Sequence, residues 1–232
     1  MKKIIVFSGA GISAESGLKT FRDSDGLWEN FEISEVATPE AWIKNPKLVL
    51  EFYNDRRKQV IEAQPNQAHI SLVQLETHYN VQIITQNIDD LHERAGSSKV
   101  LHLHGEILKS KSEKTGISQS VKGTNLNIGD LCSNNSQLRP DIVWFGESVP
   151  NMITAENLCN DADILIIIGT SLTVYPAANI IDFAPDKCEK YLIDPNKINL
   201  QGIKNLTTIN KKASIGIPIL ANILLEKYIT SQ

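Results

Sequence analysis

Short apolar segments alternate along this chain with longer segments of helical periodicity. Residues 4–7, 81–85, 164–168 and 191–193 are rich in apolar side chains and have the length of strands. Residues 164–168 are apolar at every position, which is typical of a strand buried on both faces of a parallel sheet. The alternation of such strands with helices predicts an α/β fold built on a Rossmann-like parallel sheet.

Helix signals fall between these strands. A capping threonine followed by proline at 38–39 opens a short helix, and Asn-Pro at 45–46 opens a longer one that ends near 64–65. Further helices are expected over about 67–78, from about 175 onward, and over 217–228.

Residues 107–137 differ from the rest of the chain, because they are polar and rich in turn formers. We interpret them as an excursion from the core, such as a small hairpin module, before apolar strand character returns at 138–147. The predicted core and the smaller inserted helical/loop subdomain divide the chain as follows: core 1–18, 66–105 and 140–232; subdomain 19–65 and 106–139.

Composition narrows the class of protein. The 232 residues carry a net charge of −4 with 41% hydrophobic and 22% charged residues, as in a soluble globular protein. The charge gives no sign of nucleic-acid binding, and no stretch has the length and apolarity expected of a membrane span. Cys132, Cys159 and Cys188 are too few and too far apart for a disulfide framework. We expect a cytoplasmic protein, and a monomer, although the sequence does not fix the oligomeric state.

A glycine loop follows the first strand directly. Gly9-Ala10-Gly11 lets the backbone turn sharply and approach a ligand, and a helix that starts there would offer N–H groups to a phosphate. The usual dinucleotide fingerprint has its third glycine earlier than Gly17, so hydride-transfer dehydrogenases fit poorly and a plain tight turn stays possible. Arg22, shortly after the loop, is either a solvated charge or a donor to a pyrophosphate.

Polar groups also follow the strand at 81–85. Gln86, Asn87 and Asp89 stand where open α/β sheets bind ligands, and the same pattern fits an Asx turn with a helix cap. His102 and His104 alternate in the next short strand. They could ligate a metal, but no third ligand is evident, and His104 beside a glycine suits a general base.

The helix from 46 carries an arginine in an apolar stripe. Tyr53 and Arg56 lie one turn apart on that stripe. Arg56 either extends from the edge of the stripe or pairs with a carboxylate such as Glu51, or it points with Tyr53 into a pocket that holds an anion. Periodicity does not decide between these interpretations.

Six motifs occur in a fixed order: G-A-G-I-S-A-E-S-G, T-F-R, T-Q-N-I-D-D-L-H, H-G-E, V-W-F-G-E and G-T-S. Each is weak alone, but together they resemble the sirtuin family of NAD-dependent protein deacylases over nearly the whole chain. The resemblance implies NAD as cofactor and acyl-lysine protein substrates. It implies that NAD is held by Gly9, Ala10, Gly11, Ser13, Thr20, Phe21, Arg22, Gln86, Asn87, Asp89, Gly169, Thr170, Ser171, Asp194 and Ala213.

The resemblance also implies catalytic roles. His104 would be the base that accepts a ribose hydroxyl proton, and Asn87 and Asp89 would assist the departure of nicotinamide. The acyl-lysine would lie against Val143, Trp144 and Phe145. Sirtuins commonly have asparagine where this chain has Asp194, which makes that ribose contact a weaker inference.

Sirtuins that remove succinyl, malonyl or glutaryl groups resemble this chain at Tyr53 and Arg56, where they carry Tyr-x-x-Arg. By that resemblance we expect a desuccinylase or demalonylase with weaker activity on acetyl groups. The alternatives are an NAD glycohydrolase or ADP-ribosyltransferase on the same scaffold, or a noncatalytic NAD-binding module. The presence of Asn87, Asp89 and His104 argues against the last.

The chain departs from most sirtuins in its cysteines. Most carry four zinc-binding cysteines between the H-G and W-F-G motifs, whereas here that interval holds only Cys132 and no histidine. A tetrahedral structural site needs four such ligands. We therefore expect no structural zinc, and a module held by packing and turns.

Overall fold

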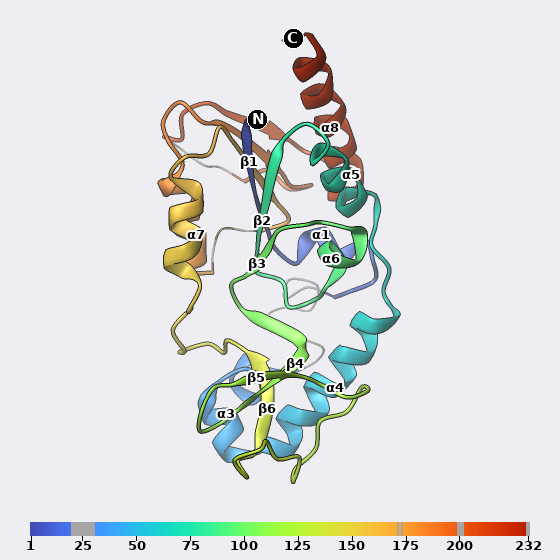
Figure 1. Ribbon diagram of the computed structural model, residues 1–232, viewed down its shortest axis with the longest axis vertical. Helices are drawn as coiled ribbons and strands as arrows, with labels where there is room; N and C mark the ends of the chain where they lie inside the picture. The colour runs from blue at the N-terminus through green and yellow to red at the C-terminus, as the bar shows by residue number, and fades with distance from the viewer. Residues whose placement is uncertain (20–30, 171, 173, 199–201, 231–232) are drawn as a thin grey trace.

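A computed structural model describes residues 1–19, 31–170, 172, 174–198 and 202–230. The described residues form a larger lobe around a parallel sheet and a smaller lobe around an antiparallel sheet, at the top and bottom of Figure 1. The larger sheet has six strands, in the order β3 (Val100–His102), β2 (Asn80–Thr85), β1 (Lys3–Ser8), β7 (Ile164–Ile168), β8 (Glu189–Ile193) and β9 (Leu206–Ile209). The predicted α/β class with a Rossmann-like parallel sheet is confirmed.

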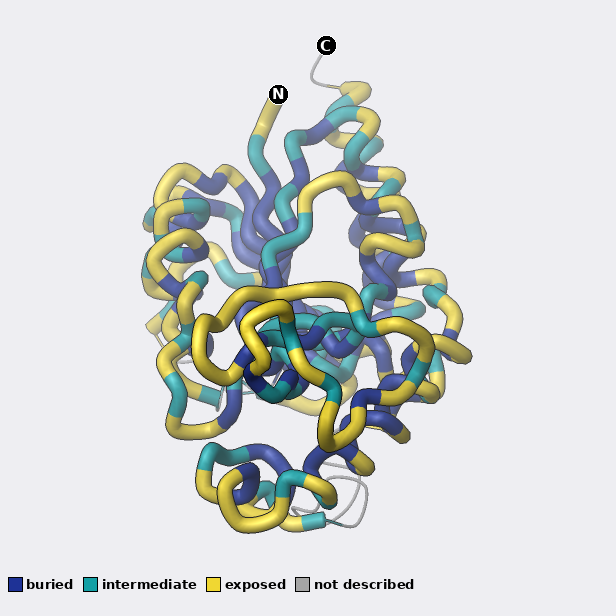
Figure 2. Tube along the Cα trace, turned by 60° about the horizontal axis from the view of Figure 1, so that its bottom comes forward, coloured by how far each residue is buried: buried dark blue, intermediate teal, exposed yellow. Residues whose placement is uncertain are grey.

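Strand β1 is the centre of this sheet, paired in parallel with β2 and β7. Its successive side chains point to opposite faces, so Ile4 and Val6 join one buried cluster and Ile5 and Phe7 the other. Figure 2 shows the buried strands enclosed by more exposed helices and loops. The apolar runs of the sequence therefore correspond to strands covered on both faces.

Helices cover both faces of the sheet. One face carries α5 (Gln67–Leu75) and α8 (Ala213–Thr230), and the other carries α7 (Met152–Cys159) and the 3₁₀ helix η1 (Ala177–Phe183). The segment expected to start a helix near 175 is thus a 3₁₀ turn structure.

Helix α8 corrects one expectation. By length and composition alone its 18 residues could cross a membrane, whereas no such stretch was expected. Ile217, Leu220 and Leu224 are buried in the core that α8 shares with the sheet and with α5, beside which it lies in Figure 1. Packing of this kind is the arrangement of a core helix.

The smaller lobe joins two separate segments of the chain. The first supplies α2 (Ile33–Val36), α3 (Pro39–Lys44) and α4 (Pro46–Glu62), and the second supplies β4 (Gly105–Ser112), β5 (Ser118–Ser120) and β6 (Leu138–Ile142). Thr38 and Asn45 cap α3 and α4 through their side chains, as the sequence predicts. Strand β6 ends at 142, so the expected strand over 138–147 was too long.

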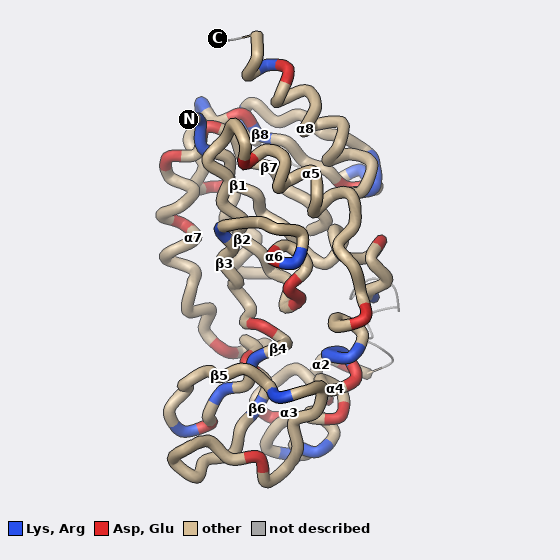
Figure 3. Tube along the Cα trace, turned by 45° about the vertical axis from the view of Figure 1, so that its right-hand side comes forward, with Lys and Arg blue, Asp and Glu red and all other residues tan. Residues whose placement is uncertain are grey.

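Two polar side chains of α4 connect these segments. Arg57 is fully buried and donates hydrogen bonds to the carbonyl oxygens of Ile107 (2.7 Å) and Thr124 (2.9 Å). The side-chain amide of Asn54 donates to the Leu126 carbonyl oxygen (3.0 Å) and accepts from the Leu126 N–H (2.9 Å). The polar excursion is therefore anchored to a helix by buried hydrogen bonds. Basic and acidic residues are interspersed over the described parts of both lobes (Figure 3).

Candidate active site

The carboxyl ends of four parallel strands meet at one cavity. The loops after β1, β2, β7 and β8 converge there from the larger lobe, and side chains of the smaller lobe close it, enclosing about 770 Å³. The sheet order reverses between β1 and β7, which is where open α/β sheets bind ligands. The predicted site residues that line the cavity are Gly9, Ala10, Gly11, Ser13, Tyr53, Arg56, Gln86, Asn87, Asp89, His104, Val143, Trp144, Phe145, Gly169, Thr170, Asp194 and Ala213. Thr20, Phe21, Arg22 and Ser171 lie outside the described residues.

Glycines make the floor of the cavity. The Gly11 N–H donates to the Gly169 carbonyl oxygen (2.9 Å), which joins the loops after β1 and β7. A Cβ atom on Gly11 would lie 2.6 Å from the Gly169 Cα atom, and one on Gly9 would lie 2.9 Å from the Gly169 oxygen. Gly169 itself has a φ of +58°. Only glycines allow this close approach, so the floor presents backbone to a ligand.

The helix after this loop is shorter than the sequence suggests. Helix α1 spans only Gly11–Ala14, so its dipole is small and its first N–H is already used by Gly169. The expected helix N-terminus is therefore only a short turn beside the glycine floor.

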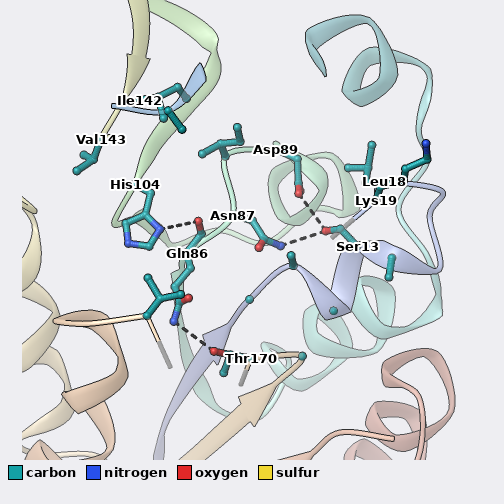
Figure 4. A pocket seen from close by; sticks show the side chains of 18 of the residues that line it. Ser13, Leu18, Lys19, Gln86, Asn87, Asp89, His104, Ile142, Val143 and Thr170 are labelled. Atoms are coloured by element: carbon teal, nitrogen blue, oxygen red, sulfur yellow. Dashed lines mark hydrogen bonds between the residues drawn. The ribbon is translucent and has the colours of Figure 1, made fainter. Parts of the chain in front are cut away.

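A hydrogen-bonded group of three polar side chains lies beside this floor (Figure 4). The Ser13 hydroxyl donates to Asp89 Oδ2 (3.0 Å) and accepts from Asn87 Nδ2 (3.1 Å). Burial raises the pKa of Asp89, while hydrogen bonds from Leu91 N–H and Ser13 act in the opposite direction. Asp89 Oδ1 also accepts from the Leu91 N–H at the start of α6 (Leu91–Ala95), whose N-cap is Asp90, so Asp89 both supports this helix start and lines the cavity.

A second hydrogen-bonded chain supports Asn87 from behind. The Asn87 N–H donates to Thr85 Oγ1 (3.0 Å), which is bonded to the Ser8 hydroxyl (2.9 Å), and Ser8 is bonded to His92 Nε2 (2.9 Å). His92 is fully buried, and burial lowers its pKa. Sequence reasoning missed this support, although His92 closes the T-Q-N-I-D-D-L-H motif.

His102, the last residue of β3, and His104 make different hydrogen bonds. His104 Nδ1 lies 3.0 Å from the Gln86 carbonyl oxygen, so it must donate, and Nε2 is left as the acceptor of the neutral ring. Burial lowers the pKa of His104, which favours that neutral form. His104 points into the cavity in Figure 4. Nε2 is therefore the ring nitrogen that can accept a proton.

His102 instead uses both ring nitrogens within the protein, on the Asn87 carbonyl oxygen (2.9 Å) and the Glu93 carboxylate (2.8 Å). Burial opposes a charge on His102, but the hydrogen bond and charge of Glu93 raise its pKa overall. Within the described ranges no three His, Cys, Asp or Glu side chains form a group that could hold a metal. Both ring nitrogens of His102 are thus already bonded within the protein.

Tyr53 and Arg56 reach the cavity from α4. Tyr53 is fully buried and Arg56 is 6% exposed, so Arg56 does not extend to solvent from the edge of the stripe. Arg56 donates to the Lys19 carbonyl oxygen (2.8 Å) and to Gln59 Oε1 (3.3 Å). The Tyr53 hydroxyl accepts from Trp144 Nε1 (3.1 Å), and burial raises the pKa of this phenol. The structure thus brings a guanidinium and a phenol to one end of the cavity.

The loop that contains the V-W-F-G-E motif connects the two lobes across the cavity. The Val143 N–H donates to the His104 carbonyl oxygen (2.9 Å), and the Phe145 N–H donates to the Ala37 carbonyl oxygen (3.0 Å). The side chain of Phe145 is 42% exposed. These bonds fix the loop beside His104 at the edge of the cavity.

Among the lining residues Glu15 was not predicted from the sequence, whereas Asp194 was. Glu15 accepts from the Ser214 N–H (2.9 Å) and hydroxyl (2.6 Å), which fixes the start of α8 to the glycine loop. At the far end Asp194 is almost fully buried and accepts from the Asn196 N–H (2.9 Å). The position of Glu15 inside the first motif is the signal that could have identified it.

The model of the Sir2 family matches residues 9–176. The chain belongs to the Sir2 family. This sirtuin is 56% identical over 213 residues to an NAD-dependent protein deacylase of Helicobacter pylori (strain ATCC 700392 / 26695), covering 92% of this chain and 93% of that relative. It is 46% identical over 231 residues to an NAD-dependent protein deacylase of Bacteroides thetaiotaomicron, covering 97% and 99% of the two chains.

Solved structures of Sir2 proteins superpose on nearly the whole chain. A complex of a Sir2 homolog with NAD superposes with a TM-score of 0.88 at 36% identity, over 98% of this chain and 91% of that one. A Sir2 protein in complex with a deacetylated p53 peptide and 3'-O-acetyl ADP ribose superposes with a TM-score of 0.78 at 28% identity, over 97% and 92%. The sirtuin described here is an NAD-dependent protein deacylase, and the predicted family, enzyme class and cofactor are confirmed.

Proposed function

We propose that this sirtuin removes succinyl and malonyl groups from protein lysines in preference to acetyl groups. The observation that supports the preference is the position of Tyr53 and Arg56. Both are buried, stand one turn apart on α4, and line the same cavity as His104 and Asn87. The preference, the residue roles and the protein substrates described below are parts of this proposal.

A buried guanidinium favours an acyl group that ends in a carboxylate. A charge-assisted hydrogen bond contributes about 1.5–3 kcal/mol, which corresponds to roughly 10- to 150-fold in binding. An acetyl group ends in a methyl and makes no such bond. The positive field of Arg56 also acts against the burial that raises the pKa of Asp89, so the acyl end and the Asn87 end of the cavity are electrostatically coupled.

The cavity suits NAD along its whole length. The pyrophosphate would lie along Gly9, Gly11 and Gly169, where two loops without side chains pack closely and leave the cavity open. Ser13, Asn87 and Asp89 would hold the nicotinamide ribose end. Asp194 and Ala213 would hold the adenosine end. Bound NAD supplies an electrophilic ribose carbon once nicotinamide leaves.

His104 would act as the base. Its Nδ1 is fixed by the Gln86 carbonyl oxygen, so Nε2 can accept a hydroxyl proton in the cavity. The lowered pKa keeps the ring neutral at neutral pH. The loop at Val143–Phe145 would hold the acyl-lysine and its peptide, by analogy with the relative that was solved with a p53 peptide. Water would enter after this proton transfer, to release the free lysine and leave the acyl group on ADP-ribose.

The direct test compares acyl groups on one peptide. The purified enzyme is incubated with NAD and matched acetyl-, succinyl- and malonyl-lysine peptides, and products are followed by mass spectrometry. We expect the succinyl and malonyl peptides to react faster, with formation of O-acyl-ADP-ribose. Faster deacetylation would refute the preference. Consumption of NAD without loss of acyl groups would indicate a glycohydrolase or an ADP-ribosyltransferase instead.

Arg56→Met sharpens this test. We expect it to lower kcat/KM for the succinyl peptide by tenfold or more, as the lower end of the range above, while deacetylation changes by less than about twofold. Arg56→Lys keeps the charge but loses the planar fork, and should recover only part of the activity. Lys58→Met on the exposed side of the same helix is the matched control. An unchanged ratio of desuccinylation to deacetylation in Arg56→Met would rule out the acidic pocket.

We also propose that the enzyme acts in the cytoplasm as a monomer, without nucleic-acid or membrane partners. Cys132, Cys159 and Cys188 are free thiols, in keeping with a reducing compartment. Fractionation of cells that express a tagged chain tests the location and the absence of membrane partners. Light scattering of the purified protein tests the oligomeric state.

A further inference from the structure

The indole of Trp144 is held from several sides at the acyl end of the cavity. Its ring is 3% exposed, and its Nε1–H donates to the Tyr53 hydroxyl oxygen (3.1 Å). Its backbone N–H donates to Glu147 Oε2 (2.8 Å). An indole has a single donor, so the orientation of this ring decides whether the bond to Tyr53 exists.

Arg139 of β6 lies over one face of the Trp144 indole ring. Its guanidinium carbon is 3.9 Å from the centroid of the Trp144 ring, which is a cation–π contact. Its Nη2 donates to Glu147 Oε1, and this ion pair is largely shielded, with side chains 11% and 24% exposed. Glu147 thus divides its two carboxylate oxygens between Arg139 and the Trp144 backbone.

These contacts form one connected unit. Glu147 fixes Arg139, Arg139 covers one face of the indole, and the indole determines the position of the phenol oxygen. Because the Tyr53 oxygen accepts the indole proton, its own proton is donated in another direction. Arg139 is not among the described residues that line the cavity, whereas its partner Glu147 is.

We infer that Arg139 is a positioning residue for acyl recognition, which acts through Trp144 on the Tyr53 hydroxyl and so helps to set the preference for carboxylate-bearing acyl groups. This inference rests on the proposed acyl preference. It assigns selectivity to a side chain of the strand layer beneath the cavity. An arginine is suited to the task because its planar group can stack on the ring and pair with a carboxylate at once.

The main experiment measures kcat and KM on matched succinyl- and acetyl-lysine peptides. Arg139→Met should lower kcat/KM for the succinyl peptide about tenfold, chiefly through KM, and that for the acetyl peptide by less, so that the succinyl-to-acetyl ratio falls, since only the carboxylate end bonds to Tyr53. Arg139→Lys should show a similar loss, because a lysine keeps the charge but not the stacked plane. An intact ratio in Arg139→Lys with a lost ratio in Arg139→Met would mean a long-range charge effect and would overturn the positioning role.

Lys109→Met is the matched control, since Lys109 pairs with Glu106 in the same small sheet without a contact to the indole. It should leave the ratio unchanged. Melting temperatures of all variants check folding, and Arg139→Lys serves if Arg139→Met is unstable.

A second readout does not depend on the acyl preference. The chain has three tryptophans, so ¹⁵N-labelled protein gives at most three indole N–H signals, and Trp144→Phe assigns one of them. We expect Arg139→Met and Arg139→Lys, but not Lys109→Met, to shift the Trp144 signal. An unmoved signal together with an unchanged ratio would refute the inference.

The two proposals fail in different ways. If Arg56→Met leaves the succinyl-to-acetyl ratio unchanged, the acidic pocket is wrong, and the selectivity role of Arg139 falls with it whatever the indole signal does. If Arg56→Met alters the ratio but neither Arg139 variant does, the proposed function stands and this inference is wrong.

Discussion

Replacing Arg57 by methionine is expected to detach the segment 105–142 from α4. Arg57 is the buried donor that joins α4 to the Ile107 and Thr124 carbonyl oxygens, and it also donates to Asn54 Oδ1 (2.7 Å). Asn54 in turn holds both backbone groups of Leu126. A single substitution therefore removes the shared donor of this network.

The magnitude follows from these contacts. Charge-assisted hydrogen bonds contribute about 1.5–3 kcal/mol each, and burial offsets part of this by lowering the pKa of Arg57 to about 10, which still leaves the side chain charged at neutral pH. Methionine fills the space but leaves the carbonyl oxygens without their donor. Each buried carbonyl oxygen left without its donor costs about 1–3 kcal/mol, so the two together cost about 2–6 kcal/mol. For a chain of this length that corresponds to a melting temperature lower by about 10 °C.

The assay combines thermal unfolding with hydrogen exchange read by mass spectrometry. We expect faster exchange in peptides from 105–142, with little change in β1 and β7. Lys58→Met, one position further along α4 and exposed, should affect neither measurement. Treatment of the wild type with a chelator should also have no effect, because we expect no structural zinc.

The opposite pattern would refute this reasoning. If Arg57→Met left exchange over 105–142 unchanged while a chelator accelerated it, or if metal analysis found stoichiometric zinc, a metal rather than α4 would hold the module.

Three further predictions concern the site and its support. Because burial lowers the pKa of His104 below its ordinary value of 6.5, kcat/KM should decline only below about pH 6.5; an acidic limb centred above pH 7 in the pH–rate profile would contradict a neutral base. Burial lowers the pKa of His69 to about 4, so the unfolded chain binds this proton first, and stability should fall by up to about 3 kcal/mol between about pH 6.5 and 4. His69→Gln should flatten that dependence in denaturant titrations, and an unaltered slope would assign it to other groups. Gly11→Ala places a Cβ atom 2.6 Å from the Gly169 Cα atom and should weaken NAD binding more than tenfold by calorimetry, whereas wild-type affinity would show that the loops can separate.

The sequence predicted the sheet well because local pattern and burial agree there. The all-apolar residues 164–168 correspond to β7 with the same bounds, since a strand covered on both faces needs no polar position. The segment 138–147 was harder to predict. Its strand ends at 142, where the backbone leaves β4, and Gly146 then adopts a positive φ. Apolar residues continue beyond that point because they line the cavity.

The candidate site, like the sheet, could be predicted only where the local sequence pattern determines the structure. Glycines and strand-end polar residues follow a local rule, so Gly11, Asn87 and His104 could be selected from the sequence. The orientation of Arg56 could not, because periodicity fits both an edge position and a buried one. The bond between Trp144 and Tyr53 joins positions 91 residues apart, and such contacts have no signature in the local pattern.

The contact between Glu15 and Ser214 has a consequence for biosynthesis. The partner of Glu15 is made 199 residues after Glu15 itself. At about 5–20 residues per second, that interval lasts about 10–40 s. Throughout it the nascent chain has neither the start of α8 nor the wall of the cavity that α8 provides. The cavity therefore acquires this part of its wall only after α8 has been made, and chains that stop before α8 lack it.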